Sequence, residues 1–352
     1  MTNSYHIQST LYLFCLLLLT AISCKNIDTA VHNTDDDNSA NKKAYAMVIH
    51  GGAGTILKNN MTDEKEAAYT AALNEALSIG ETILKDGGSS LDAVVNTIKF
   101  MENSPLFNSG KGAVFAHDGR NMLDASIMQG NDMNAGAIAG VTNVKNPITG
   151  AVAVMQKSDH VLLSGTGAEE FCKGQNLEIV DNKYFYTEDR FNSLQRVLEK
   201  EKALGYQYDP EIDSKFGTVG AVALDREGNI VAGTSTGGMT NKRYDRIGDS
   251  PVIGAGTYAN NNTCGVSCTG HGEFFIRYAV AHDVSAMMEY SGVSVEHAAH
   301  EIINEKLVKA GGSGGLISLD KNGNISMPFN TAGMYRGYIT DTDRYVGIYK
   351  ED

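Results

Sequence analysis

The most reactive arrangement in the sequence is Gly217-Thr218, at the head of a short apolar run. Uncut, this pair indicates only a turn before a strand, because a threonine hydroxyl is a weak nucleophile at its ordinary pKa. If the bond before Thr218 is cut, the new α-amino group, with a pKa near 7.7 to 8.0, stands beside that hydroxyl and can act as its base. Gly217 suits such a cut, because a residue without Cβ tolerates the strain of attack on its own carbonyl. The pair therefore predicts a nucleophile and a base within one residue, created by self-cleavage.

A second threonine is expected beside the first. Val219 to Leu224 and Ile230 to Ser235 are each six residues of strand-forming type, and Asp225 to Asn229 form the turn between them. In such a hairpin the start of the first strand lies level with the end of the second, which places Thr236 next to Thr218. The hydroxyl of Thr236 can then orient the nucleophile, although threonine is also an ordinary strand residue.

The polar loop after this hairpin carries two opposite charges, Arg246 and Asp249. A guanidinium grips a carboxylate as a two-pronged fork, and a carboxylate accepts an ammonium group. Together the two side chains could hold both charged ends of a free amino acid. Taken on their own they favour a surface ion pair, which contributes roughly 0 to 1 kcal/mol.

The segment from Cys264 to Glu273 runs from a strand through glycines into a helix expected to begin near Glu273. Backbone N–H groups at a helix start, together with the Thr269 hydroxyl, can face a developing negative charge. Thr269 and Gly270 are therefore the candidate oxyanion-binding residues, and the alternative is a glycine turn without a ligand. His271 is interpreted as a loop residue rather than a base.

The elements that must position these residues alternate in type. A strand over 44–50 precedes Gly51 to Gly54, a helix capped by Thr62 runs to Gly87, and a second helix begins near Ser90. Further strands are expected at 137–141, 161–163, 219–224, 230–235, 264–268, 315–319 and 325–329, and further helices at 189–203, 273–290 and 294–309. Asp320 to Gly323 joins the last two strands as a hairpin. Hairpin-paired strands flanked by helices predict an α+β fold of antiparallel sheets covered by helices.

The first 23 residues predict a signal peptide, because they carry no Lys, Arg, Asp or Glu and contain an apolar run, 11–22, too short to span a bilayer. The run ends at Cys24 in a pattern like a bacterial lipoprotein cleavage box, and ordinary cleavage near Ser23 is the alternative. The polar residues 24–43 predict a tether. The chain is thus expected to be exported, in a bacterium as a periplasmic or outer-membrane-anchored lipoprotein that touches the membrane only through its lipid.

Composition excludes several classes of protein. A formal net charge of −13, from 42 acidic and 29 basic residues, would repel a phosphate backbone, so no nucleic-acid partner is expected. His297 and His300 share a helix face, yet neighbouring acidic residues favour a solvated surface over a metal site. Cys264 and Cys268 could pair in an exported chain, whereas small buried thiols are the simpler interpretation.

Six motifs in order make the sequence resemble the plant-type L-asparaginase and isoaspartyl peptidase family of N-terminal nucleophile hydrolases. The resemblance covers residues 44 to 352. The motifs are His50-Gly-Gly-Ala-Gly54, Pro105-Leu-Phe-Asn108-Ser-Gly110, Gly217-Thr-Val-Gly-Ala-Val-Ala-Leu-Asp225, Thr234-Ser-Thr-Gly-Gly-Met-Thr-Asn-Lys242, Arg246-Ile-Gly-Asp-Ser-Pro251 and Cys268-Thr-Gly-His-Gly-Glu273.

The resemblance implies a four-layer αββα sandwich that cleaves itself into an alpha subunit, 44–217, and a beta subunit, 218–352. It also implies a homodimer of such cleaved protomers, no cofactor for the chemistry, and hydrolysis of asparagine and β-aspartyl dipeptides through an aspartyl ester on the nucleophile. The implied roles are Thr218 as nucleophile, Thr236 as its orienter, Thr269 and Gly270 as the oxyanion hole, Arg246, Asp249 and Gly272 as holders of the substrate's charged groups, and Asn108 as a pocket residue.

A structural sodium ion is also implied by the resemblance, held by backbone carbonyls of the loop from Glu102 to Lys111. The residues concerned are Glu102, Phe107, Ser109 and Lys111. Ser109 and Lys111 depart from the family pattern, where alanine and a neutral residue are expected.

Three other functions fit parts of the sequence. A glycosylasparaginase, which cleaves the sugar-to-asparagine bond, usually has Asp where Gly217 stands. Gly233-Thr-Ser235-Thr-Gly237 matches G-x-S-x-G and His50-Gly-Gly resembles a lipase oxyanion loop, but no helix follows Ser235 as a nucleophile elbow requires. A binding lipoprotein without catalytic activity would have no need of Gly217-Thr218.

Overall fold

The computed structural model describes residues 44–204 and 217–350. The predicted signal peptide, Cys24 and the tether lie outside the described residues. Within those two ranges, no helix is long and apolar enough to cross a membrane.

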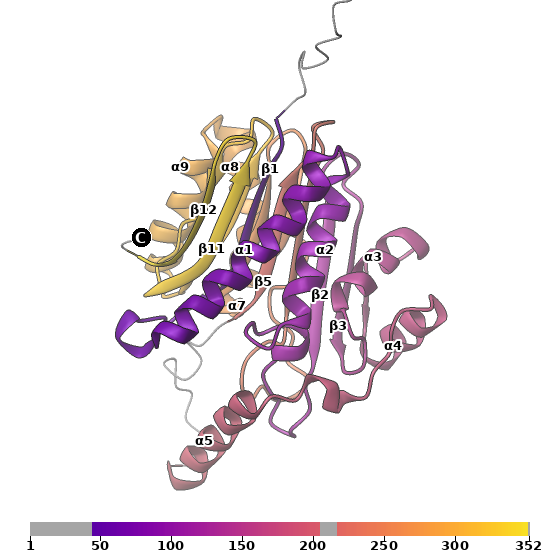
Figure 1. Ribbon diagram of the computed structural model, residues 1–352, viewed down its shortest axis with the longest axis vertical. Coiled ribbons are helices and arrows are strands. Elements are labelled where there is room, and N and C mark those ends of the chain that lie inside the picture. The colour runs from indigo at the N-terminus through magenta and orange to yellow at the C-terminus, as the bar shows by residue number, and fades with distance from the viewer. Residues whose placement is uncertain (1–43, 205–216, 351–352) are drawn as a thin grey trace, which may run out of the picture. The chain divides into compact units, whose positions relative to one another are not determined.

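Two β-sheets form the middle of the described structure (Figure 1). The larger sheet has the order β12 (Arg344–Tyr349), β11 (Gly333–Thr340), β1 (Ala46–Gly54), β5 (Val219–Leu224), β6 (Ile230–Thr236), β2 (Leu123–Gln129), β3 (Ala135–Val141) and β4 (Leu162–Ser164). The smaller sheet has the order β10 (Ile325–Ser326), β9 (Gly314–Asp320), β8 (Cys264–Gly270) and β7 (Thr257–Ala259). Only β3 and β4 pair in parallel; the other neighbouring strands named here are antiparallel.

Helices cover the outer face of each sheet. The helices are α1 (Asp63–Lys85), α2 (Ser90–Asn103), α3 (Pro147–Lys157), α4 (Gly165–Gly174), α5 (Glu188–Leu204), α7 (Gly272–Tyr278), α8 (Val280–Ser291), α9 (Val295–His300) and α10 (Leu307–Lys309). Short 3-10 turns lie at Lys58–Asn60, Gly110–Gly112 and Asn182–Phe185, and a π-helical turn, Glu301–Lys306, joins α9 to α10. In Figure 1, α1 and α2 lie over the larger sheet, and α8 and α9 are seen behind β11 and β12. The helix α8 contacts β7 and β8, and α9 contacts β9 and β10, so these two helices cover the smaller sheet and the predicted αββα sandwich is confirmed.

The two faces of the central strands belong to different cores. In β1, Met47 and Ile49 pack with the helix layer, whereas Val48 packs between the sheets. The same alternation in β5 places Ala221 on the helix side and Val222 between the sheets, because successive strand residues point to opposite faces. By this alternation, even-numbered residues of β5 and β6 face the second sheet and odd-numbered residues face the helices.

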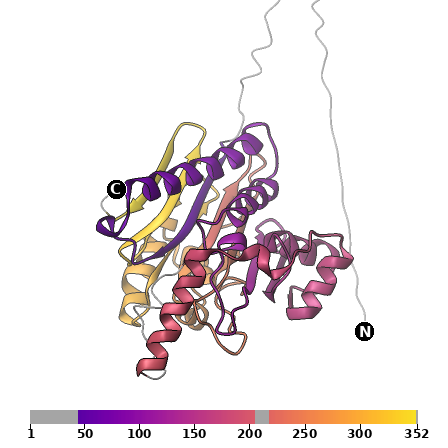
Figure 2. The same cartoon turned by 60° about the horizontal axis from the view of Figure 1, so that its bottom comes forward.

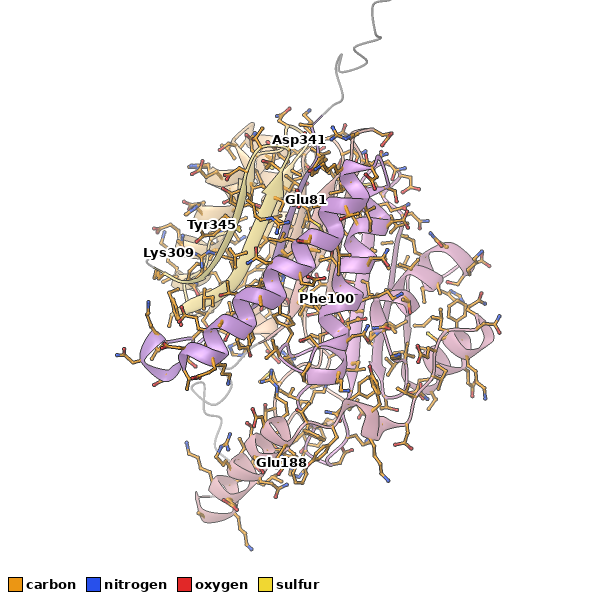
Figure 3. The ribbon with its side chains drawn as sticks, viewed as in Figure 1. Glu81, Phe100, Glu188, Lys309, Asp341 and Tyr345 are labelled. Atoms are coloured by element: carbon orange, nitrogen blue, oxygen red, sulfur yellow. The ribbon has the colours of Figure 1, made fainter. Side chains whose placement is uncertain are left out.

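Local signals placed the first helices correctly. The Thr62 hydroxyl accepts a hydrogen bond from the Lys65 N–H and caps α1, and Ser89 caps α2 through the Asp92 N–H. An ion pair between Glu81 of α1 and Arg344 of β12 joins the helix layer to the edge strand of the larger sheet. Figure 3 labels Glu81 on α1.

Two predicted elements differ from the structure. The helix expected over 273–290 is broken at Ala279, which has a left-handed φ of 48°. The N–H groups of Ala281 and His282 donate to carbonyls of Ala255 and Gly254 instead of continuing the first helix. The strand expected over 325–329 ends at Ser326, and Phe329 keeps only an isolated bridge to Gly315.

The helix α5 extends away from the sandwich, as Figure 2 shows. Arg190 near its start donates from Nε to the Gly112 carbonyl at 3.0 Å and from Nη2 to the Leu106 carbonyl at 3.2 Å. Glu201 near its end accepts hydrogen bonds from Asn241 and Arg243. The helix is thereby fixed to two loops that border the candidate site described next.

Candidate active site

Thr218 and Thr236 lie side by side, as the hairpin predicts. The register of β5 against β6 pairs Val219 with Ser235 and Gly220 with Thr234, so Thr218 falls opposite Thr236. The Thr218 hydroxyl donates to the Thr236 hydroxyl oxygen over 3.1 Å. The same oxygen accepts the Gly238 N–H at 3.0 Å, which orients it toward Thr218.

A small pocket opens beside this pair. Its lining consists of Gly217, Thr218, Thr236, Gly238, Met239, Arg246, Gly248, Asp249, Ser250 and Gly270. The structure therefore brings together the threonine pair, one oxyanion candidate and both charged candidates. Asn108, Thr269 and Gly272 are not part of this lining and lie directly around it, as the following paragraphs show.

The guanidinium of Arg246 is paired with Glu273 rather than with Asp249. Its Nε and Nη2 donate to the two carboxylate oxygens of Glu273 at 2.9 and 2.8 Å. His271 also approaches Glu273, at 3.3 Å from Nε2 to Oε2. Glu273 stands in the first turn of α7 and is not among the site residues predicted from the sequence.

Asp249 is a buried carboxylate in the lining of the pocket. Its side chain is 5% exposed, and its Oδ2 atom has no hydrogen-bond partner among the described residues. Burial raises the pKa of Asp249 to about 7, although the charge of Arg246 acts in the opposite direction. Such a group, buried and unpaired on one oxygen, can accept a cation from a ligand.

Gly272 sits between these two charged groups. A Cβ on Gly272 would lie 2.8 Å from both Arg246 Nη2 and Asp249 Oδ1. Only glycine leaves the space in which Arg246 and Asp249 stand close together, so Gly272 shapes the charged end of the pocket through its lack of a side chain.

The oxyanion candidates stand at the end of β8. Gly270 lines the pocket, and a Cβ there would lie 2.5 Å from the Ser313 carbonyl oxygen. The Thr269 hydroxyl is fully buried and accepts the Ala53 N–H at 3.3 Å. Because a hydroxyl oxygen can accept while its hydrogen donates elsewhere, Thr269 retains its own hydrogen for a second acceptor.

Asn108 contacts the residues before β5 and after β6. Its side-chain amide donates to the Gly238 carbonyl at 2.7 Å, and its Oδ1 accepts the Val114 N–H at 2.9 Å. A Cβ on Gly217 would lie 2.8 Å from Asn108 Cβ, so glycine is needed at 217 for this close packing. Asn108 therefore supports the residues on both sides of the pocket.

The loop predicted to hold sodium turns tightly around two glycines. A Cβ on Gly110 would lie 2.2 Å from the Glu102 carbonyl oxygen, and one on Gly112 would lie 2.0 Å from the Phe107 carbonyl oxygen. Backbone carbonyls of the turn therefore leave no space for a side chain at either position. Ser109 and Lys111, the two residues that depart from the family pattern, contact other side chains. The Ser109 hydroxyl bonds to the Ser235 hydroxyl at 2.7 Å, and the Lys111 ammonium lies 5.1 Å from the Tyr184 ring centroid.

Ser235 does not occupy the position of a nucleophile. It is fully buried on the helix side of β6, where its hydroxyl donates to Glu102 Oε1 at 2.7 Å. The sheet around it is antiparallel and the described chain after β6 is a loop, so the α/β-hydrolase alternative is not favoured.

The structure also places the cysteines considered for a disulfide and the histidines considered for a metal site. Cys172, Cys264 and Cys268 are free buried thiols, and burial raises the pKa of Cys264 to about 12. His297 and His300 are exposed. In the part of the chain that the structure describes, no three His, Cys, Asp or Glu side chains gather as a metal site would need.

Comparison with known proteins agrees with this geometry. A family model described as asparaginase matches residues 43–348. The isoaspartyl peptidase of Salmonella typhimurium is 48% identical over 309 residues, which cover 87% of this chain and 98% of that protein. The isoaspartyl peptidase of Escherichia coli is 46% identical, covering 87% of this chain and 96% of the relative. The isoaspartyl peptidase/L-asparaginase of Xenopus laevis is 39% identical, covering 86% and 94%. The chain belongs to the asparaginase family of N-terminal nucleophile hydrolases.

Proposed function

We propose that this protein hydrolyses the side-chain amide of L-asparagine and the isopeptide bond of β-aspartyl dipeptides, with Thr218 as the nucleophile. The observation that carries the proposal is the 3.1 Å hydrogen bond between the Thr218 and Thr236 hydroxyls, beside a pocket that also holds Arg246 and Asp249. The names of the relatives support the same two substrate classes.

The first step is cleavage of the bond between Gly217 and Thr218. The Thr218 hydroxyl attacks the Gly217 carbonyl carbon, the ester that forms is hydrolysed by water, and the new α-amino group of Thr218 is released. In the uncut chain Gly217 itself lines the pocket, so cleavage also opens that side for a substrate.

Turnover then uses the freed amine as base. It takes the proton of the Thr218 hydroxyl as the oxygen attacks the substrate's side-chain carbonyl, and it returns the proton to the departing amine. The oxyanion forms next to Thr269 and Gly270, whose donors stabilise it. Water hydrolyses the aspartyl ester in the second half-reaction, which yields aspartate and restores the Thr218 hydroxyl.

The charged end of the pocket selects the substrate. The Asp249 carboxylate accepts the α-ammonium group, and Arg246 donates to the α-carboxylate from the Nη1 edge that Glu273 does not occupy. Gly272 leaves room for both contacts.

The test is expression of the wild-type chain and Thr218→Ala, followed by gel electrophoresis and steady-state kinetics. The wild type should run as two pieces, the second beginning at Thr218, and should hydrolyse asparagine and β-aspartyl dipeptides. Thr218→Ala should remain whole and inactive. A whole wild-type chain with full activity would contradict the proposal, and a preference for a glycosylated asparagine would favour the glycosylasparaginase alternative.

We also propose a sodium ion in the loop from Glu102 to Lys111 and a homodimer of cleaved protomers. The family resemblance supports both proposals. Elemental analysis of protein dialysed against sodium or against choline, with thermal melts in both buffers, tests the first. Light scattering tests the second.

Export is proposed from the apolar run at 11–22, with lipidation at Cys24. Mass spectrometry of the mature N-terminus distinguishes a lipid on Cys24 from ordinary cleavage near Ser23. An unprocessed Met1 in cell extracts would contradict both.

A further inference from the structure

A row of buried polar side chains crosses the space between the two sheets, directly behind the threonine pair. It consists of His50 on β1, Ser267 on β8, Thr234 on β6, Thr257 on β7 and Ser126 on β2, and all five are fully buried. Their surroundings are otherwise apolar, with Val48, Val222, Val266 and Leu316 in the same layer. Polar groups are costly in such a place, so a continuous row of them requires a reason.

The row forms a continuous series of polar contacts that reaches a backbone carbonyl of the pocket region at each end. His50 Nδ1 lies 3.0 Å from the Thr218 carbonyl oxygen, and His50 Nε2 lies 3.0 Å from Ser267 Oγ. The series continues from Ser267 Oγ to Thr234 Oγ1 over 2.6 Å, and from Thr234 Oγ1 to Thr257 Oγ1 over 2.5 Å.

The far end of the row reaches the charged end of the pocket. Ser126 Oγ lies 2.8 Å from Thr257 Oγ1 and 2.5 Å from the Ser250 carbonyl oxygen, and its single hydrogen can be donated to one of the two. Ser250 follows Asp249 and lines the pocket. This series of contacts therefore runs from the nucleophile to the segment that carries Asp249.

The direction of the first two hydrogen bonds follows from chemistry. A carbonyl oxygen only accepts, so His50 Nδ1 must carry a hydrogen and donate it to Thr218. Burial lowers the pKa of His50 to about 3, so the ring is neutral and its Nε2 has no hydrogen. Ser267 must then donate to Nε2, and its hydroxyl fixes the tautomer of His50.

Gly220 of β5 leaves space for His50 and Ser267 because it has no side chain. A Cβ on Gly220 would lie 2.0 Å from Ser267 Oγ and 2.3 Å from His50 Nε2. Gly220 is two residues after Thr218 on the same face of β5. The absence of a side chain there is what allows His50 and Ser267 to meet beneath the nucleophile.

We propose that His50 and Ser267 are positioning residues for Thr218: they hold its carbonyl group, and so the orientation of its amine and hydroxyl, during self-cleavage and turnover. The inference rests on the proposed role of Thr218 and assigns no contact between His50 and the substrate. Fixing one side of the Thr218 backbone limits rotation of the residue that must serve as both nucleophile and base.

Ser267→Ala tests the inference with a small change. It removes the hydroxyl that fixes the His50 tautomer and should lower kcat roughly 10- to 100-fold, with little change in KM, because the charged end of the pocket is untouched. Self-cleavage should slow in the same variant. The matched control is Ser285→Ala, because Ser285 is also buried and bonds to the Thr263 hydroxyl at 2.6 Å, in a pair that makes no hydrogen bond to Thr218 among the described residues.

A purely structural role predicts that both alanine variants lose similar thermal stability and keep the wild-type kcat, and that result would overturn the inference. As a second measurement, His50→Asn retains a donor near the position of Nδ1, whereas His50→Leu has none. The asparagine variant should recover part of the kcat that the leucine variant loses. Equal kcat in the two, each folded, would likewise count against it.

The outcome is separable from the proposed function. A wild-type enzyme without Thr218-dependent activity would remove the function and this inference together. A wild type that cleaves itself and turns over through Thr218, alongside an unimpaired Ser267→Ala, would remove the inference alone.

Discussion

Glu273 holds Arg246 by two parallel hydrogen bonds, from Nε to Oε1 at 2.9 Å and from Nη2 to Oε2 at 2.8 Å. Burial would raise the pKa of Glu273, but hydrogen bonding to Arg246 and the guanidinium charge lower it below the usual value. Glu273 therefore remains ionised and fixes the plane of the guanidinium. The remaining Nη1 edge is presented in a fixed direction, which suits recognition of a planar carboxylate.

Arg246→Lys should raise KM roughly 10- to 100-fold with a smaller effect on kcat, because lysine cannot bond to Glu273 and to a substrate carboxylate with one planar group. Steady-state kinetics on asparagine measures this. Glu273→Gln is the control variant: it keeps the arginine and weakens only its support, so its KM should lie between those of wild type and Arg246→Lys. An unchanged KM in Arg246→Lys would return this residue to the surface ion pair.

Thr269→Ala should lower kcat about 100- to 1,000-fold while KM changes little, because one donor to the oxyanion is lost and the charged end of the pocket is intact. Thr269→Ser is the control, since it keeps the hydroxyl that accepts from Ala53. A large rise in KM with unaltered kcat would place Thr269 in substrate binding instead.

The pH profile of kcat/KM should fall on the acid side with the titration of two groups. Asp249, whose pKa burial raises to about 7, must be ionised to bind an ammonium group, and the Thr218 amine must be neutral to act as base. The logarithm of kcat/KM should therefore approach a slope of about 2 well below pH 7. Asp249→Asn should lower kcat/KM and reduce that slope to about 1. An identical acid-side slope in the wild type and in Asp249→Asn would show that Asp249 does not titrate in the pH profile of kcat/KM.

Glu102 should make folding stability depend on pH. Burial raises the pKa of Glu102 from 4.5 to about 7, although hydrogen bonds from Ser235 and Ile148 lower it, and Oε2 has no partner among the described residues. The unfolded chain ionises first as pH rises, so the contribution of Glu102 is fully present below about pH 4.5 and is lost as pH approaches and passes 7.

The loss is of order 3 kcal/mol at about 1.4 kcal/mol per pKa unit. Denaturant unfolding of the Thr218→Ala chain, which stays whole, should show a free energy of unfolding that falls between pH 5 and 8. Adding Glu102→Gln should flatten part of this decline, since glutamine does not titrate. Parallel curves for the two proteins would show that Glu102 has no such pKa shift.

The residues that local sequence could place are those within one hairpin or one helix end. Thr236 was found beside Thr218 because only a tight turn separates β5 from β6, and a short antiparallel hairpin fixes its register locally. The partner of Arg246 was not found. Glu273 lies 27 residues away and meets Arg246 only after the two sheets pack, so nothing in the intervening sequence indicates the pair.

The strand β2 shows a different limit. Asp124 and Ser126 occupy its inward positions and are fully buried, so polar residues fall where a strand pattern requires apolar ones. Their partners come from distant segments: Asp124 accepts the Gly140 N–H, and Ser126 bonds to Ser250 and Thr257. A buried polar row of this kind becomes visible only when the strands that share it are known.

The order of the larger sheet determines what a cut at Gly217 can do. Strand β1 precedes the cut, yet it lies between β11 and β5, which follow it, and β6 is bonded on its other side to β2. Three of the seams in this sheet thus join segments from opposite sides of the severed bond. Strands of the two polypeptides that such a cut would produce alternate in this sheet. The two polypeptides therefore cannot separate without breaking the hydrogen bonds of all three of these strand pairs. The larger sheet is complete in neither fragment, so each should be insoluble when made alone, and a new N-terminus at Thr218 would be created inside a scaffold that had already assembled as one chain.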